Sequence, residues 1–305
     1  MPARREFLTT AFAALAGSSL LHPLRSIGAG PANSGATAVP NEAGLTIREV
    51  IDLIQAETPG APFPDTVDTI KSGDRDQPVK GIVTTMFATD AVIDKTIRAG
   101  ANFIIAHEPT FYNHPDETDW LEKDPVFQFK QQLLKTHNIV VWRFHDGIHA
   151  HRPDGIRMGV MDALGWIRYY SPDNPFLVTI PDAAFGELVL RVKKSLGIDK
   201  MRVIGDSKQI IKKVVLAPGS GGGRIQIGMI RQYQPDLIIC GEINEWETSE
   251  YVRDARYSGQ KISLMVLGHS VSEEPGMQWL VKWLTPKLPG VAITHIPSGE
   301  AFRTV

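Results

Sequence analysis

Short apolar runs alternate with amphipathic stretches along most of the chain. Runs rich in isoleucine and valine, bounded by polar turn residues, predict buried strands at KGIVTTMF, NFIIAH and IVVWRF. Helical spacing predicts helices over DAVIDKTIRAG, which ends at Gly100, and over DPVFQFKQQLLKTH. A first helix is predicted over TIREVIDLIQAE, where Thr46 and Glu49 form a capping-box pattern. Strands that alternate with helices indicate a parallel-rich sheet.

The alternation starts again after Trp166, with strands predicted in FLVTIP, MRVIG, KKVVLAPG and DLIICGE and helices in FGELVLRVKKSLG and IQIGMIRQY. The last strand, KISLMVLG, and the helix EEPGMQWLVKWLTP are assigned to the first domain, because the polar residues between them match earlier polar clusters. The chain is therefore predicted to be an α/β protein with two domains. Residues 45–168 plus 262–305 form one domain, and residues 169–261 form the other.

The N-terminus has a different character. Arg4 and Arg5 precede a short, moderately apolar stretch, which predicts a twin-arginine export signal over residues 1–30, followed by a linker over residues 31–44. The apolar stretch is too short for a membrane anchor, and no cysteine follows it to carry a lipid. We therefore expect export to the periplasm or the extracellular space, without a stable membrane anchor.

Composition narrows the function classes. The formal net charge is only −2 and no run of lysine or arginine occurs, so the chain is not expected to bind nucleic acid. The lone Cys240 excludes an internal disulfide and, inside an apolar run, is predicted to be buried and inert. The glycine-rich APGSGGG lacks the Lys-Ser/Thr of a phosphate-binding loop, so a close backbone approach is the favoured reason for its glycines.

Histidines and carboxylates follow three of the predicted strands. These clusters are His107-Glu108, then His145-Asp146 with His149, and finally His269 with Glu273. In open α/β sheets, ligands bind beyond the carboxyl ends of the strands. Imidazole and carboxylate without thiolate is the donor set of zinc, iron, manganese or cobalt. An isolated strand-end histidine is more often structural, so the three clusters together carry the prediction of a metal site.

The local patterns leave some geometry open. His107 and Glu108 are sequence neighbours whose side chains diverge, which favours two adjacent ions over a single one. His145 and His149 would share one face of a helix, but a loop is equally compatible with the nearby glycine and proline. Glu274 is a competing carboxylate, and a capping role is the alternative for Ser272 or Glu273. Pro275 indicates a helix start nearby.

The clusters, in this order, resemble those of the Nif-three-like dinuclear metal proteins, also named GTP cyclohydrolase I type two homologues. The resemblance runs from Leu45 to the C-terminus and is carried by GIVTTMFATDAVIDKTIRAGANFIIAHEPTF, FHDGIHAHRPDGI, CGEINEWETSEYVRDA and GHSVSEEPGMQWL. It implies two related α/β domains with mixed sheets and a metal cleft formed by the N- and C-terminal segments. It also implies a homo-oligomer, a toroidal hexamer.

By this resemblance, two divalent transition metal ions are held by His107, Glu108, His149, His269 and Glu273. Glu273 is expected to span both ions, with His107 and His269 on one side and Glu108 and His149 on the other. Glu108 stands where the family has a second histidine, and His149 where it has an aspartate. The number of histidine and carboxylate ligands is thus kept while their positions are exchanged.

The expected activity follows from such a centre. A metal-dependent hydrolase would act on a small molecule such as a nucleotide, another phosphoester or a cyclic amide. Asp146 and His145 are the candidates for proton transfer, and His145 is alternatively a sixth ligand or a partner of a ligand. His114 and Glu242 are further candidates for support of the site. A non-catalytic metal-binding or interaction protein is the alternative function.

Overall fold

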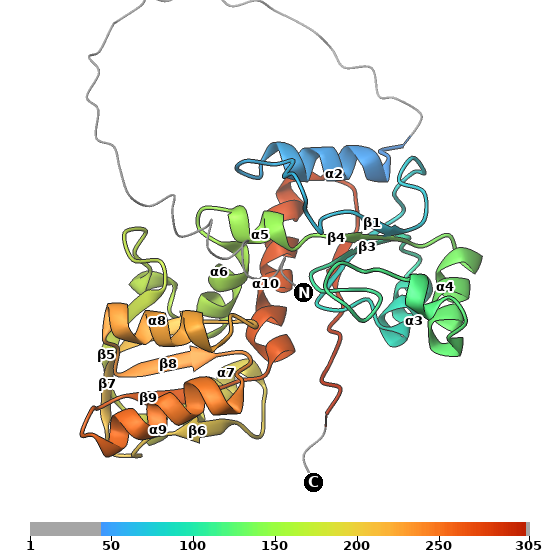
Figure 1. Cartoon of the computed structure of the whole chain (residues 1–305). Helices are drawn as coiled ribbons and strands as arrows, with labels where there is room; N and C mark the ends of the chain where they lie inside the picture. Colours follow the sequence, from blue (N-terminus) through green and yellow to red (C-terminus); the bar gives the residue numbers. More distant parts are fainter. Residues whose placement is uncertain (1–43, 303–305) are drawn as a thin grey trace, which may run out of the picture. The chain divides into compact units, whose positions relative to one another are not determined.

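The structure, a computed structural model, describes residues 44–302 (Figure 1). The predicted export signal and all but the last residue of the predicted linker lie outside the described residues. Within the described part of the chain, no helix is both long and apolar enough to cross a membrane.

The first helix confirms the capping-box prediction. α2 (Ile47–Ala56) begins after Thr46, whose side chain accepts from the Glu49 backbone N–H while the Glu49 carboxylate accepts from the Thr46 N–H. The helix buries Ile47, Val50, Ile51 and Ile54, the positions that its spacing predicts. This buried stripe belongs to the same core cluster as the strands of the first sheet.

The first sheet has the strand order β1-β4-β3-β2-β10. Its three predicted strands are parallel and fully buried, and helices α3 and α4 connect them. The edge strands β1 and β10 were not predicted, because three half-buried residues are too short to show a strand pattern. β1 pairs antiparallel with β4, which makes the sheet mixed. The bounds are β1 (Ile70–Ser72), β2 (Ile82–Thr85), α3 (Asp90–Arg98), β3 (Phe103–Ala106), α4 (Pro125–Thr136), β4 (Val140–Arg143) and β10 (Ile293–His295).

The second sheet has the order β5-β7-β8-β9-β6 and is also mixed, since β5 and β6 run antiparallel to their neighbours. Its parallel centre, β7-α8-β8-α9-β9, repeats the run β2-α3-β3-α4-β4 of the first sheet. The predicted α/β class with two mixed sheets is therefore confirmed. The bounds are β5 (Leu177–Ala184), α7 (Phe185–Leu196), β6 (Arg202–Ile204), β7 (Ile210–Ala217), α8 (Gly223–Tyr233), β8 (Leu237–Cys240), α9 (Glu250–Tyr257) and β9 (Ser263–Val266).

The membership of β9 differs from the predicted residue ranges. Residues 262–305 were assigned to the first domain, but β9 pairs with β8 and β6 in the second sheet. The chain returns to the first sheet with α10 (His269–Leu284), where Met277, Leu280 and Leu284 join the core of α2 and the first sheet. Cys240, at the end of β8, is fully buried, and burial raises the pKa of its thiol, as expected for an inert residue.

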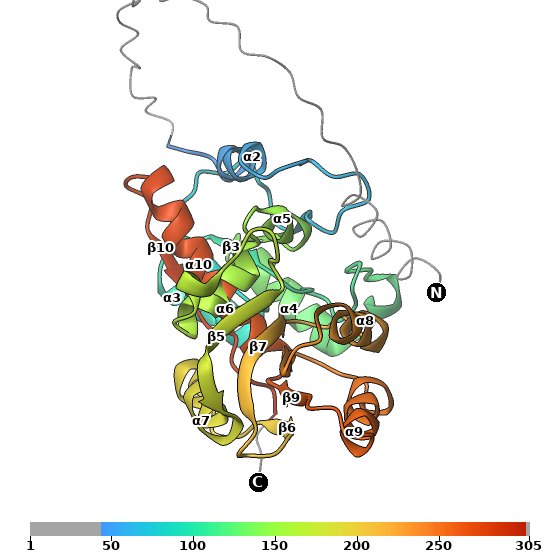
Figure 2. The same ribbon diagram turned by 90° about the vertical axis from the view of Figure 1, so that its left-hand side faces the viewer.

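Helix α10 begins at His269, six residues before the predicted signal at Pro275, which lies inside the helix. Figure 2 shows α10 beside α6 (Gly155–Ala163) and β10. A Cβ on Gly159 would lie 2.2 Å from the carbonyl oxygen of Pro275, so a glycine permits the close contact between α6 and α10. Proline disfavours a helix interior, and we attribute the continuation of α10 past Pro275 to its packing against α6.

Candidate metal centre

The carboxyl ends of strands from both sheets meet at one place. His107 and Glu108 follow β3, and His145 lies just after β4. From the second sheet, Glu242 follows β8, and His269 follows β9 as the first residue of α10. His107 and Glu108, which precede the second sheet in the sequence, therefore lie close to His269, which follows its last strand. A site formed by N- and C-terminal segments is what the resemblance implies.

The cluster after β4 is helical, which settles the alternative that the sequence left open. α5 (Asp146–Ala150) begins directly after His145, and His149 lies in its last turn. The carboxylate of Asp68 accepts from the backbone N–H groups of His145, Asp146 and Gly147 at 2.7, 2.9 and 2.7 Å. Asp68 therefore fixes the start of the helix, which follows His145 and contains His149.

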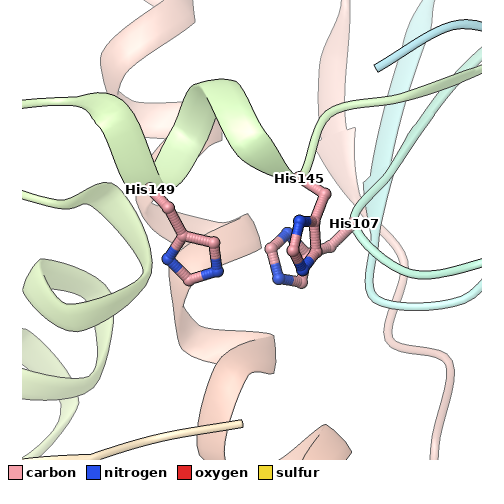
Figure 3. Close-up of side chains that lie close together, drawn as sticks. All are labelled: His107, His145 and His149. Atoms are coloured by element: carbon pink, nitrogen blue, oxygen red, sulfur yellow. The ribbon is translucent and has the colours of Figure 1, made fainter. Parts of the chain in front are cut away.

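Three imidazole rings lie within contact of one another (Figure 3). The ring centroids of His107 and His145 are 4.8 Å apart and stacked, and the His149 centroid lies 5.2 Å from His107 and 5.1 Å from His145. One nitrogen from each ring falls in a group whose members are all within 4.8 Å of one another. Ligand atoms of His107, Glu108 and Glu273 form a second such group.

Each of four imidazoles is oriented through Nδ1. Because carbonyl and carboxylate oxygens only accept, Nδ1 carries the proton in each ring. Nε2 of each ring then faces the shared space, where it can bind a metal ion once it carries no proton, as is typical of metal-binding histidines. The four contacts are His107 Nδ1 to the Phe144 carbonyl at 3.3 Å, His145 to Asp146 at 2.9 Å, His149 to Asp154 at 3.1 Å and His269 to Glu242 at 3.0 Å.

Two carboxylates lie among these nitrogens. Glu273 Oε2 is 3.4 Å from His107 Nε2 and 3.0 Å from His269 Nε2, so it contacts both sides of the cluster. Glu108 Oε1 is 3.1 Å from His269 Nε2 and 3.9 Å from His145 Nε2. These contacts are compatible with a spanning Glu273. His107 shares one group of donor atoms with His145 and His149 and another with Glu108 and Glu273, while His269 contacts Glu108, so the grouping differs from the pairing inferred by resemblance.

The residues fit a metal. His107 Nε2 is fully buried and makes no hydrogen bond of good geometry, although it faces a carboxylate. A buried polar atom without such a bond is costly unless something else coordinates it. Nitrogen and oxygen donors, with no sulfur, match zinc, iron, manganese or cobalt.

The charges of the cluster are strongly coupled. Burial raises the pKa of Glu108, but its hydrogen bond to His269 and the nearby histidines outweigh this and lower it to about 2. Glu273 is likewise held well below its usual pKa, because the contacts with His107 and His269 outweigh its burial. Burial lowers the pKa of His269, but the same two carboxylates raise it to about 11. Asp154 similarly outweighs burial and raises the pKa of His149 to about 9.

The two predicted proton-transfer residues form a pair. Asp146 Oδ1 lies 2.9 Å from His145 Nδ1, and Oδ2 accepts from the Thr66 hydroxyl at 2.7 Å. Burial opposes ionisation of Asp146, yet these hydrogen bonds hold its pKa well below the usual range. Its oxygens are thus committed to orienting His145. Burial lowers the pKa of His145 to about 4, so this imidazole is neutral near pH 7.

The residues that the sequence left as alternatives have other contacts. Glu274 accepts from the Met86 N–H at 3.3 Å and from the backbone and hydroxyl of Ser298 at 3.2 and 2.9 Å. Neither Ser272 nor Glu273 caps α10, whose N-cap is Gly268 without a side-chain hydrogen bond. His114 lies beside the cluster, with its ring centroid 5.6 Å from that of His145.

The glycine-rich loop packs against the cluster from the second sheet. A Cβ on Gly219 would lie 2.2 Å from Glu273 Oε1, and Gly219 has a left-handed φ of +72°. A Cβ on Gly241 would lie 2.3 Å from the Ser272 hydroxyl. Ser272 Oγ in turn accepts from the Gly219 N–H at 2.9 Å. The predicted close backbone approach is confirmed, and the group that it approaches is a candidate ligand.

Sequence reasoning missed three supporting residues: Asp68, Asp154 and Arg143. Arg143 is fully buried and its Nη2 donates to Glu108 Oε2 at 3.1 Å. A single arginine in the apolar run IVVWRF was the available signal, because a cation is seldom fully buried without a paired anion.

Comparison with known proteins identifies the family of the chain. A family model for Duf34/NIF3 (NGG1p interacting factor 3) matches residues 47–300. The chain belongs to this family. Within the Duf34/NIF3 family it is similar to a Clostridium acetobutylicum protein named GTP cyclohydrolase 1 type 2 homolog, with 27% identity over 235 residues, 72% of this chain and 82% of the relative. It is 26% identical over 214 residues to an Escherichia coli K12 protein of the same name, covering 68% of this chain and 79% of the relative.

Solved structures show the same fold. A Staphylococcus aureus hypothetical protein matches with a TM-score of 0.68 and 16% identity, covering 86% of this chain and 100% of that one. A Bacillus cereus protein related to NIF3 matches with a TM-score of 0.68 and 15% identity, covering 87% and 99%. The family predicted by resemblance is therefore confirmed by the family model, and the fold by the structures.

Metal uptake is expected to release protons. In the metal-free protein near pH 7.5, His149 and His269 are protonated, because their pKa values are raised to about 9 and about 11. A metal ion needs the Nε2 lone pair, so each imidazole must lose a proton on binding and the apparent affinity should rise as the pH increases through about 9. Calorimetry in buffers of different ionisation enthalpy measures this release. A heat that does not depend on the buffer would contradict it.

Proposed function

We propose that the protein is a metal-dependent hydrolase whose centre takes two divalent transition metal ions. The observation that carries the proposal is the orientation of four imidazoles, each held at Nδ1, around the carboxylates of Glu108 and Glu273. Two donor groups that share His107, with Glu273 in contact with both His107 and His269, favour two adjacent ions over one.

The residues have distinct tasks in this proposal. His107, Glu108, His149, His269 and Glu273 hold the ions. Bound divalent ions would supply Lewis-acid activation of water and of the substrate. His145 is neutral near pH 7, so its Nε2 serves as a further ligand or accepts a proton from the attacking water, while Asp146 keeps the ring in position.

The substrate proposed is a small molecule with a hydrolysable bond: a nucleotide, another phosphoester or a cyclic amide. The name GTP cyclohydrolase 1 type 2 homolog, carried by the relatives, supports this range. Export by the twin-arginine route to the periplasm or beyond, and assembly into a hexamer, complete the proposal. Neither nucleic acid nor a stable membrane anchor forms part of it.

A second candidate function is metal binding without turnover. It is favoured by the burial of the candidate ligands, because His107, Glu108 and Glu273 expose 0%, 7% and 3% of their surface. The exposed part of the cluster is formed by His145, His149, His269 and Glu242, whose side chains are 20%, 32%, 20% and 55% exposed. A substrate would have to approach over these side chains.

The test is an assay of purified protein against esters, phosphoesters and cyclic amides, with and without added metal. Hydrolysis should depend on the metal and should be lost in a variant carrying both His107→Ala and His269→Ala. His137→Ala is a suitable control, because His137 is an exposed residue at the end of α4. Activity that survives the double substitution, or that never depends on metal, would contradict the hydrolase proposal. Metal binding without any turnover would favour the second candidate.

A further inference from the structure

Arg143 is a buried cation next to the candidate metal centre. It is the last residue of β4 and has no exposed surface. Its Nε donates to the His107 carbonyl at 3.1 Å, and Nη1 donates to the His114 carbonyl. Its Nη2 donates to Glu108 Oε2 at 3.1 Å. One guanidinium thus binds the loop after β3 at both ends and also binds the carboxylate that the loop carries.

The two carboxylate oxygens of Glu108 have different partners. Oε2 faces Arg143, whereas Oε1 faces His269 Nε2 at 3.1 Å. A charge-assisted hydrogen bond to a fully buried guanidinium is strong and directional. Oε2 is therefore committed to the arginine, and only Oε1 is directed toward the cluster of imidazoles.

Arg143 is itself held in place. Asp116 Oδ2 lies 3.5 Å from Arg143 Nη1 and 3.2 Å from Lys71 Nζ, and all three side chains are buried. Positive and negative side chains therefore alternate along this series of contacts, which runs from Lys71 through Asp116 and Arg143 to Glu108 at the candidate centre. Such a buried network has few alternative arrangements, because each charge would lose its partner if it moved.

We propose that Arg143 is a positioning residue that restricts Glu108 to one metal-directed oxygen and so makes the centre selective for ions that prefer imidazole. This inference rests on the metal-binding part of the proposed function. With one oxygen of Glu108 withheld, three carboxylate oxygens of Glu108 and Glu273 remain beside the imidazole nitrogens of the ligand histidines, and His145 as a further ligand would give the nitrogens the majority. Zinc and iron suit imidazole, whereas manganese and magnesium prefer carboxylate and water oxygens.

The planar guanidinium is essential to this arrangement. Arg143 donates in three directions at once from a rigid fork, which the single ammonium of a lysine does not reproduce. Arg143→Lys keeps the positive charge but should release Glu108 Oε2. The freed carboxylate can then turn and offer both oxygens to an ion.

The experiment compares metal selectivity in the full chain and in Arg143→Lys by competition between zinc and manganese. The zinc affinity of the variant should fall by about 10- to 100-fold, the usual effect of removing a partner of a metal ligand, while manganese affinity changes less. The visible spectrum of the cobalt-loaded protein should also change, since it reports the ligands and their geometry. Thermal denaturation and circular dichroism establish that the variant is folded.

Lys71→Met is the matched control. It removes a buried cation from the same network, but Lys71 contacts Asp116 and not Glu108. It should lower the thermal stability while leaving the zinc-to-manganese preference and the cobalt spectrum as in the wild type. If Arg143→Lys does not fold, Arg143→Gln, which retains two donor hydrogens, provides the second variant for the same measurements.

Unchanged selectivity and an unchanged cobalt spectrum in a folded Arg143 variant would overturn the inference. The same shift in Lys71→Met would also overturn it, because the effect would then belong to the network as a whole. A wild-type protein that binds no metal would instead refute the proposed function. The two failures are therefore distinguishable.

Discussion

Glu273→Gln is expected to remove nearly all tightly bound metal. Glu273 is buried, ionised and in contact with both His107 Nε2 and His269 Nε2. Glutamine has the same shape but no charge, and only its neutral carbonyl oxygen, a weaker donor than a carboxylate, can still bind a cation. Loss of a ligand partner typically costs about 10- to 100-fold in metal affinity, and loss of an ionised ligand should exceed this range. Elemental analysis after dialysis, with circular dichroism to confirm folding, measures the effect.

The neighbouring Glu274→Gln is the matched control for this substitution. Glu274 lies in the same helix but accepts hydrogen bonds from Met86 and Ser298, and its carboxylate lies 3.1 Å from His295 Nε2. It should lower stability modestly and leave the metal content unchanged. A Glu273→Gln protein that retains its metal, or a Glu274→Gln protein that loses it, would mean that the ligand has been assigned to the wrong glutamate.

Gly219→Ala is expected to disrupt metal binding although it replaces no ligand. The added Cβ would lie 2.2 Å from Glu273 Oε1, so either the carboxylate or the loop must move. The left-handed φ of +72° adds strain of about 1–2 kcal/mol for a non-glycine residue. Metal content and thermal stability should therefore both fall.

Gly100→Ala separates these two effects. Gly100 has a similar φ of +70° at the end of α3, but no atom lies within 4 Å of its added Cβ. This variant should show the backbone strain as a small loss of thermal stability and bind metal as the wild type does. If Gly219→Ala binds metal equally well, the glycine-rich loop does not press on the site.

The parallel strands of the first sheet and the residues of the site could be predicted from the sequence, because their local patterns agree with the tertiary structure. β2, β3 and β4 are fully buried, so each appears as a short apolar run, and the polar residues that follow must lie at one edge of the sheet. Thr46 with Glu49 likewise marks a helix start through purely local contacts. Such features require no knowledge of distant residues.

Other features depend on distant contacts and left no readable pattern. β1 and β10 are three residues long and exist because they pair with β4 and β2. Pro275 indicated a helix start, but the helix begins at His269, because packing of α6 against α10 outweighs the loss of one backbone hydrogen bond. β9 was assigned to the wrong group of strands, since an apolar run does not reveal which sheet it joins.

The residues around the ligands were the hardest to foresee. Asp68 and Asp154 are single acidic residues whose partners, the start of α5 and the ring of His149, become neighbours through local turns and distant packing. Arg143 stood out in its apolar strand, but only the structure shows that Glu108 is its partner. The sequence therefore indicates which types of donor are present, and the fold determines how each is oriented.

The most direct test of the central claim is the metal content of the purified protein, measured by elemental analysis after incubation with zinc, iron, manganese or cobalt and removal of the excess. The site predicts about two equivalents of a transition metal per chain, as in other paired-ion centres. A protein that retains no metal under any of these conditions would contradict the account.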